Sequence, residues 1–304
     1  MKKCDIIIKN NAFYSEELMK IKESRALSFI VVTLVYALCT LVGVGQYGYL
    51  PYSTFVNLLI ADTASTVCCF IFSLIFKNSS VYDPYWSVAP IVIVIAYAVR
   101  DGLTSLGVLM LIAVCFWGLR LTANWAYTFK NLCHQDWRYT MLKEKTGKFY
   151  PLINFVGIHY VPTLVVYGCM LPVVAVIENK AEINALSVVF VGVSVFAAIL
   201  QGVSDIQMHR FRKNRNGTFI RNGLWRHSRH PNYLGEILMW WGMGLSALCA
   251  MPKMWYLIFG AAANTALFLF VSIPMADKRQ SKKDGFEKYK RETRMLLPVR
   301  RFKK

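Results

Sequence analysis

The sequence predicts an all-α fold: a polytopic integral membrane helical bundle of about eight transmembrane helices, with both termini cytoplasmic. The first observation behind this prediction is composition, because 56% of the 304 residues are hydrophobic and only 17% are charged. The second is pattern, because the hydrophobic residues form unbroken runs rather than the alternation expected of a soluble domain. The same composition excludes disordered, collagen-like and disulfide-rich chains.

Eight runs are long and apolar enough to cross a hydrocarbon core. In chain order they cover residues 26–45, 54–76, 84–99, 103–123, 152–177, 184–204, 233–250 and 254–275. Before the first run, hydrophobic residues between Ile6 and Ile21 predict an amphipathic helix on the membrane surface.

The third observation is the charge, since 35 Lys and Arg against 17 Asp and Glu give a net +18. With eight crossings, 32 of the 35 basic residues fall in the termini and in alternate loops on one side of the membrane. Cytoplasmic segments carry the Lys and Arg excess, so both termini are expected in the cytoplasm. Contact with anionic lipid headgroups accounts for much of this charge.

Two kinds of partner are not expected. No nucleic-acid-binding signature accompanies the basic residues. No metal site is expected either, because His227 and His230 have no nearby pair of carboxylates or thiolates. The eight cysteines contain no C-x-x-C pair, and most lie within the apolar runs as small fillers.

A basic segment between the sixth and seventh runs stands apart from the other loops. It is rich in arginine, whose planar guanidinium binds phosphate through two parallel hydrogen bonds. Pro231 marks the start of a helix whose free N–H groups attract anions. Glu236, one turn into that helix, is costly to leave unpaired and is expected to meet an arginine or a ligand hydroxyl.

From Gly223 to Glu236 the sequence reads GLWRHSRHPNYLGE, which closely resembles the C-terminal signature of the membrane reductases related to steroid 5-alpha-reductase and the sterol reductases. The resemblance continues through DIQMHRFR at 205–212, DKR at 277–279, GFEKY at 285–289 and Leu297-Pro298. Two earlier stretches, WGLRLT at 117–122 and QDWRY at 135–139, are similar to the bacterial branch. The resemblance as a whole covers roughly residues 83–298, and it implies a multi-pass protein of the bacterial inner (cytoplasmic) membrane.

This resemblance implies that a cytoplasmic loop and the tail bind NADPH. Arginines would contact the phosphates, and amide, carboxyl and phenol groups would contact nicotinamide or ribose. The matched cofactor-binding positions are Asp205, Arg212, Arg229, His230, Asn232, Tyr233, Glu236, Asp277, Arg279 and Tyr289. The chain then divides into a cytoplasmic amphipathic segment (1–25), N-terminal transmembrane helices (26–80) and a reductase-like core (81–304).

The catalytic positions depart from the family pattern. Steroid reductases place glutamine followed by glutamate in an early span, with a tyrosine on the neighbouring span. Here Tyr82 and Asp83 occupy the pair and Trp117 stands at the tyrosine position. Tyr82, Asp83 and Tyr85 supply a carboxyl and two phenols as candidate acids, although Asp83 equally suits a helix N-cap before Pro84.

The reaction that the resemblance implies is NADPH-dependent reduction of a carbon–carbon double bond conjugated to a ketone. The substrate would be lipophilic, such as a 3-oxo-4-ene steroid or a bile-acid-like sterol. An S-adenosylmethionine-dependent membrane methyltransferase is the alternative, since that group shares an Arg-His-Pro-x-Tyr-x-Gly run. A transporter with Asp62, Asp83 or His159 as an intramembrane relay is a third hypothesis, but it leaves the arginine-rich segment unexplained.

Overall fold

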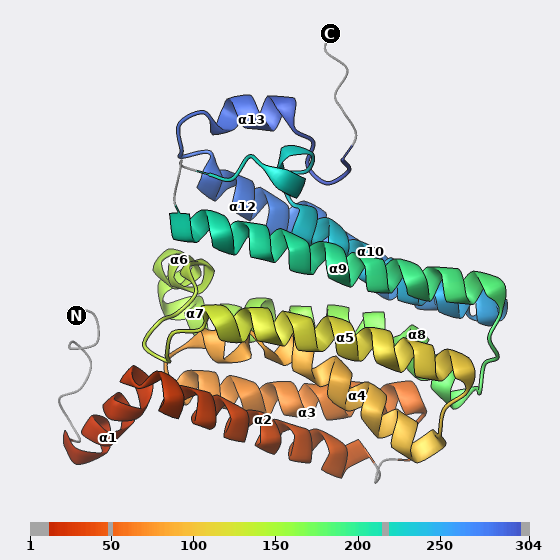
Figure 1. Ribbon diagram of the computed structural model, residues 1–304. Helices are drawn as coiled ribbons and strands as arrows, with labels where there is room; N and C mark the ends of the chain where they lie inside the picture. Colours follow the sequence, from red (N-terminus) through yellow and green to blue (C-terminus); the bar gives the residue numbers. More distant parts are fainter. Residues whose placement is uncertain (1–11, 48–50, 215–218, 299–304) are drawn as a thin grey trace. The chain divides into compact units, whose positions relative to one another are not determined.

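A computed structural model describes residues 12–47, 51–214 and 219–298 (Figure 1). Within these ranges the chain is helical and no β-strand forms. Among the described residues, seven helical stretches are long and apolar enough to cross a membrane: Arg25–Gln46, Thr54–Ile75, Ser79–Asp101, Ser105–Thr128, Trp137–Glu178, Ala185–Asn214 and Pro252–Gln280. The predicted class is therefore confirmed, and the protein is a multi-pass integral membrane protein.

The predicted span at 233–250 forms helix α10 (Pro231–Ala250), but α10 is not among those seven stretches. The reason is local composition, because Asn232, Tyr233 and Glu236 in its first two turns lower its mean hydropathy. Whether α10 crosses the membrane decides on which side the C-terminus lies, so the predicted topology remains a prediction.

The chain packs as two compact units, one formed by residues 1–92 and 122–164 and the other by 93–121 and 165–304. Helices α4 (Tyr85–Asp101), α5 (Ser105–Thr128) and α8 (Val161–Glu178) each contribute residues to both units. The predicted boundaries at 25 and 80 divide the chain by expected role rather than by packing, and they remain a prediction.

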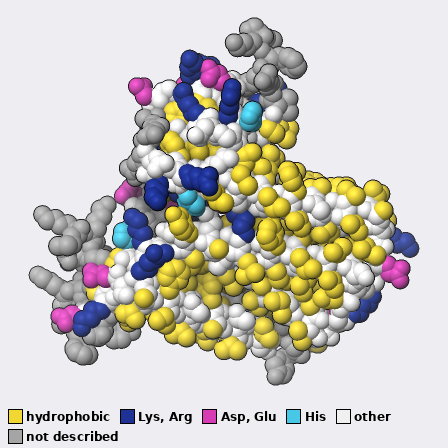
Figure 2. Space-filling view, in the orientation of Figure 1, with side chains coloured by type: hydrophobic (Ala, Val, Ile, Leu, Met, Phe, Trp, Pro, Cys, Tyr) yellow, Lys and Arg dark blue, Asp and Glu magenta, His cyan; other side chains and the backbone are white. Residues whose placement is uncertain are grey.

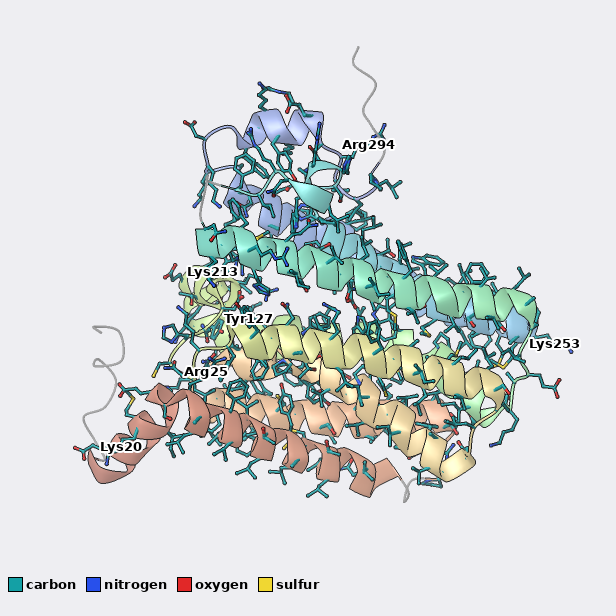
Figure 3. The ribbon with its side chains drawn as sticks, viewed as in Figure 1. Lys20, Arg25, Tyr127, Lys213, Lys253 and Arg294 are labelled. Carbon is teal, nitrogen blue, oxygen red and sulfur yellow. The ribbon has the colours of Figure 1, made fainter. Side chains whose placement is uncertain are left out.

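The first unit is built around two long helices, α2 (Arg25–Tyr47) and α3 (Thr54–Ile75), which pack against each other. Helix α1 (Ala12–Glu23) forms within the predicted amphipathic segment, whereas Ile6–Ile8 lie outside the described residues. Arg25 at the start of α2 donates to the Ala126 carbonyl at 3.1 Å, beside Tyr127 (Figure 3). The remaining elements are η1 (Ser79–Tyr82), α6 (Trp137–Thr146), η2 (Gly147–Phe149), α7 (Tyr150–Ile153) and the π-helix η3 (Asn154–Tyr160).

The second unit is built around α9 (Ala185–Asn214) and α10, which pack antiparallel to each other. Glycines on α10 allow the two helices to approach closely. A Cβ at Gly242 would lie 2.7 Å from the Phe190 carbonyl oxygen, and one at Gly235 would lie 2.7 Å from that of Ala197. The other elements are η4 (Gly223–Arg226), η5 (Pro252–Ile258), α11 (Phe259–Leu267), the π-helix η6 (Phe268–Ser272), α12 (Ile273–Gln280) and α13 (Phe286–Glu292).

The surface of the second unit separates apolar from basic regions. Figure 2 shows hydrophobic side chains over the long helices and Lys and Arg gathered around α12 and α13. Leu186, Val189, Phe196 and Val203 of α9 are all exposed, as expected of a lipid-facing surface. Lys213 and Lys253 lie at opposite ends of the α9–α10 pair (Figure 3).

Candidate functional site

Arg229, His230 and Asp277 form a buried brace in the second unit. Arg229 Nη2 donates to Asp277 Oδ2 at 2.9 Å, and His230 Nε2 lies 3.0 Å from Asp277 Oδ1. Arg229 Nη1 also donates to the carbonyl of Thr293 at 2.7 Å. The protein thus occupies both terminal nitrogens of Arg229, which the sequence suggested as a phosphate ligand, and the brace fixes the loop before α10 to α12 and the tail.

Tyr289 completes this brace from α13. Its hydroxyl donates to the carbonyl of Trp225 in η4. Burial raises the pKa of the Tyr289 phenol, so the group stays a neutral donor. Four of the ten predicted cofactor residues are therefore brought together, but in a geometry that positions backbone rather than presenting side chains to a ligand.

Glu236 is the centre of a second buried network. Its Oε2 accepts from Trp117 Nε1 at 2.9 Å and from Gln201 Nε2 at 2.7 Å, and its Oε1 accepts from Trp240 Nε1 at 2.8 Å. The direct partners of Glu236 within the described chain are not arginines, although Arg120 lies within range of its charge, and contact with a ligand hydroxyl remains a prediction. Two indoles and an amide satisfy the carboxylate instead, which lowers the cost of burying it.

Arg120 of α5 joins this network to Asp205. Its Nη1 donates to Asp205 Oδ2 at 2.9 Å, and its Nη2 donates to Gln201 Oε1. The guanidinium is largely buried, and its Nε has no hydrogen-bond partner within the described ranges. Asp205 therefore orients a cation in the unit interior.

Two exposed arginines, Arg212 at the end of α9 and Arg279 at the end of α12, form a cationic cluster with the half-buried Lys283 after α12. Burial, and then the positive charges of Arg279 and Arg212, lower the pKa of the Lys283 ammonium. The Lys283 ammonium therefore lies within range of the positive charges of Arg279 and Arg212. Such an arrangement stabilises a bound polyanion, because an anion removes the repulsion.

The start of α10 offers hydrogen-bonding groups beside a ring stack. His230 and Tyr233 stack with centroids 5.2 Å apart, and no side chain caps the helix. The Oδ1 atom of Asn232 is buried without a hydrogen-bond partner among the described residues. A buried unsatisfied acceptor is costly, so this atom fits an amide N–H or hydroxyl donor of a ligand.

These features fit the phosphorylated dinucleotide that the sequence leads us to expect. Arg212, Arg279 and Lys283 fit its phosphates, and Asn232 fits the carboxamide of its nicotinamide ring. Residues 215–218 of the intervening loop, including Arg215, lie outside the described residues. Within the described ranges, no three His, Cys, Asp or Glu residues are placed to hold a metal ion.

The three predicted catalytic residues are all placed in the interior of the first unit. The Tyr82 hydroxyl lies 2.8 Å from Thr163 Oγ1, and the Tyr85 hydroxyl donates to Asp62 Oδ1 at 2.8 Å. Tyr139 donates to Asp83 Oδ1 at 2.5 Å. Asp83 therefore pairs with a phenol, and its predicted role as a helix N-cap remains a prediction.

His159 adds a fourth chemical group to this interior. It is fully buried, and its Nδ1 lies 2.9 Å from the carbonyl of Asn154. A carbonyl only accepts, so Nδ1 carries the proton and Nε2 is left as an acceptor, without a partner in the described chain. Its ring centroid is 4.7 Å from that of Tyr82.

Some contributing residues were missed by the reasoning from sequence. Gln201 is a polar residue inside an apolar run, a signal that marks interior positions, whereas Asp62 was considered only as part of a transporter relay. Trp240 lies four residues after Glu236, the spacing at which helical side chains meet. Thr163 carries no such signal, since threonine is common in transmembrane helices.

The fold and these two sites define a class, a helical multi-pass membrane protein with buried acid–phenol pairs and an exposed cationic cluster. The chain belongs to the family described as "Protein of unknown function (DUF1295)", which matches residues 69–293 and is a family in the steroid 5-alpha-reductase-like group. An uncharacterized protein of Schizosaccharomyces pombe is 25% identical, over 70% of this chain and 69% of that protein. No solved structure matches the chain significantly.

Proposed function

We propose that the protein is an NADPH-dependent reductase of a carbon–carbon double bond conjugated to a ketone in a lipophilic, steroid-like substrate. The observation that carries the proposal is the cationic cluster, where the positive charges of Arg279 and Arg212 act on Lys283 and a phosphorylated cofactor relieves the repulsion on its ammonium. The unpartnered Asn232 Oδ1 at the start of α10 supports it, because it needs a donor.

In this proposal each unit has a separate chemical task. When bound, NADPH supplies the hydride. The second unit binds the cofactor through the cationic cluster and Asn232, while the Arg229 and Glu236 networks hold α5, α9, α10 and α12 in register. The buried phenol and carboxyl groups of the first unit hydrogen-bond the substrate carbonyl and stabilise the developing enolate.

The membrane is part of the proposed chemistry. A lipophilic substrate partitions into the bilayer and reaches a buried site without crossing water, while the basic loop and tail take a charged cofactor from the cytoplasm. Membrane lipids are the other expected partners, since exposed apolar side chains line α9.

The test uses the full chain in lipid nanodiscs with NADPH and a 3-oxo-4-ene steroid, following the loss of NADPH absorbance and the reduced product by mass spectrometry. Titration calorimetry compares NADPH, NADH and S-adenosylmethionine. Arg279→Gln should weaken NADPH binding about tenfold or more, the cost of one charge-assisted contact, and should weaken NADH less. The exposed Arg294→Gln is the matched control.

If the protein bound S-adenosylmethionine but not NADPH, the reductase proposal would be rejected in favour of the methyltransferase alternative. NADPH binding without steroid reduction would retain the cofactor and reject the substrate class. If Arg279→Gln weakened the binding of NADPH and of NADH equally, Arg279 would not contact the 2′-phosphate.

A further inference from the structure

The π-helix η3 leaves His159 with one unsatisfied ring nitrogen in the interior of the first unit. His159 is fully buried, and its Nδ1 lies 2.9 Å from the carbonyl oxygen of Asn154. Because a carbonyl oxygen only accepts, Nδ1 carries the ring proton and Nε2 keeps a lone pair. Nε2 is buried and has no hydrogen-bond partner among the described residues. The ring can therefore accept one more hydrogen bond, but it has no second proton to donate.

Asn154, the first residue of η3, has the same deficit. Its Nδ2 lies 3.3 Å from Ser73 Oγ, and the Ser73 hydroxyl donates to the Phe70 carbonyl at 2.8 Å. Because the Ser73 proton is already in use, Asn154 is the donor in their contact, and this fixes the orientation of its amide. Asn154 Oδ1 is left buried without a partner in the described part of the chain. Both unsatisfied atoms of η3 are acceptors, so a hydrogen-bond donor is what each of them lacks.

The walls around His159 are aromatic. The ring centroid of Tyr82 in η1 lies 4.7 Å from that of His159, and Phe70 of α3 meets the imidazole edge-on at 5.3 Å. Phe70 also packs against Phe155 at 5.0 Å, and both phenylalanines are half-buried. An apolar wall with one or two placed polar groups is typical of sites for lipophilic ligands.

We propose that His159 Nε2 accepts a hydrogen bond from a hydroxyl group of the lipophilic substrate. This inference rests on the proposed reductase function, because it places that hydroxyl beside Tyr82, a candidate acid. It narrows the substrate to steroid-like enones that also carry a hydroxyl. The ligand reaches His159 from the bilayer by displacing the half-buried ring of Phe70. A ketone in the same place is rejected, since two acceptors would then face each other without a proton.

The local structure of η3 supports a role in binding. A buried acceptor without a donor destabilises a folded chain, so the free protein bears a cost at Nε2. A π-helix is a rare conformation that is frequently found at functional sites. Because η3 combines both features at His159, a ligand hydroxyl supplies the hydrogen bond that the free protein lacks.

The first test measures binding without turnover, with the full chain in lipid nanodiscs and radiolabelled saturated 3-oxo steroids. The steroids are compared in pairs that differ only in a hydroxyl or a ketone, placed on ring C in one pair and on ring D in the other. In at least one pair the hydroxyl steroid should bind about tenfold or more tightly than the ketone, the effect of one unpaired buried acceptor. Equal affinities within both pairs would overturn the inference.

Two variants at His159 test whether this residue is the source of the preference. His159→Phe keeps a planar ring without an acceptor, and it should weaken binding of the hydroxyl steroid about tenfold or more while leaving the ketone unaffected. His159→Gln supplies an amide oxygen and should keep part of the preference. Tyr160→Phe is the matched control, because Tyr160 is the neighbouring residue of η3 and its ring stacks on Phe155. It should leave both affinities unchanged, and a full preference in His159→Phe would show that another residue binds the hydroxyl.

A second readout follows the ring nitrogen in the wild-type chain and needs no variant to fold with full affinity. In protein with isotope-labelled histidine, the resonance of an unprotonated ring nitrogen moves to lower frequency when that nitrogen accepts a hydrogen bond. Loss of a signal in His159→Gln identifies the resonance of His159. The hydroxyl steroid should move it and the paired ketone should not. A resonance that is already at its hydrogen-bonded position without ligand, and stays there with either steroid, would mean that water alone occupies Nε2 and would overturn the inference.

Failure of this inference can be told apart from failure of the proposed function. A hydroxyl preference that depends on His159, without reduction of any enone, would retain the hydroxyl site and reject the reductase. Reduction of enone steroids without any hydroxyl preference would retain the reductase and reject the hydroxyl site.

Discussion

Lys283 shows how one residue reports on the proposed cofactor site. Burial and the charges of Arg279 and Arg212 both disfavour its ammonium form and lower its pKa. A lowered pKa leaves a larger share of neutral amine at mildly alkaline pH, so Lys283 should react several-fold faster than Lys282 with amine-modifying reagents. Removal of one neighbouring charge should raise the pKa, and Arg279→Gln should therefore slow the labelling. Peptide mass spectrometry measures both rates.

A bound polyanion should raise the pKa of Lys283, as the loss of a neighbouring cation does. Pyrophosphate or NADPH places negative charge beside the ammonium and raises its pKa, so either ligand should protect Lys283. Exposed Lys282 is the neighbouring control and should label at the same rate with and without ligand. Faster labelling of Lys283 in Arg279→Gln would show that the electrostatic account of the cluster is wrong.

At the scale of elements, α8 and α11 approach each other closely because glycines lie at their contact. A Cβ at Gly260 would lie 2.1 Å from the carbonyl carbon and oxygen of Gly168, whereas one at Gly192 would meet nothing within 4 Å. Gly260→Ala must therefore push the two helices apart and should destabilise the protein by about 1–3 kcal/mol. Thermal unfolding in detergent, followed by circular dichroism, measures the change.

Gly192→Ala is the matched control for this contact. Both glycines lie in helices, so each substitution gains the same helix propensity, about 0.5–1 kcal/mol. Gly192→Ala should be neutral or slightly stabilising. If both variants unfold at the wild-type temperature, the close approach of α8 and α11 does not contribute to stability.

The same helices show what the sequence can and cannot predict. Apolar runs predict the helices because each run must satisfy its own backbone in lipid. Burial of Glu236 is predicted for the same reason, since a charge in an apolar helix needs partners. The partner Trp117 is not predictable, because it lies 119 residues away in sequence. Local sequence patterns carry no information on which distant side chain contacts Glu236.

The two candidate sites differ in the same way at the scale of the whole molecule. The arginine-rich segment is continuous in sequence, so Arg212 and the start of α10 were found without a structure, and Arg279 was found through the family resemblance. In the first unit, the contact of Thr66 with Thr163 joins residues that are 97 positions apart. A phenol and a carboxyl were expected in this unit, but the pairing of Tyr85 with Asp62 could be seen only in the packed helices.

The topology of the whole chain is the remaining prediction, and it depends on α10. If α10 crosses the membrane, the crossings are even in number, Lys253 faces away from the cytoplasm and the basic tail returns to it. This arrangement places 32 of the 35 basic residues on the cytoplasmic side, and we expect it. If α10 remains in the cytoplasm, Lys253 is cytoplasmic and the twelve basic residues from 276 onward lie outside. Epitope tags inserted beside Lys253 and after Lys304 distinguish the two arrangements, read by antibody binding to inside-out vesicles of the membrane in which the chain is expressed. Of these two tags, only the one after Lys304 should be reachable by the antibody. A third tag before Met1 should be reachable in either arrangement and serves as the control. The reverse result for the first two tags would remove α10 from the crossing helices.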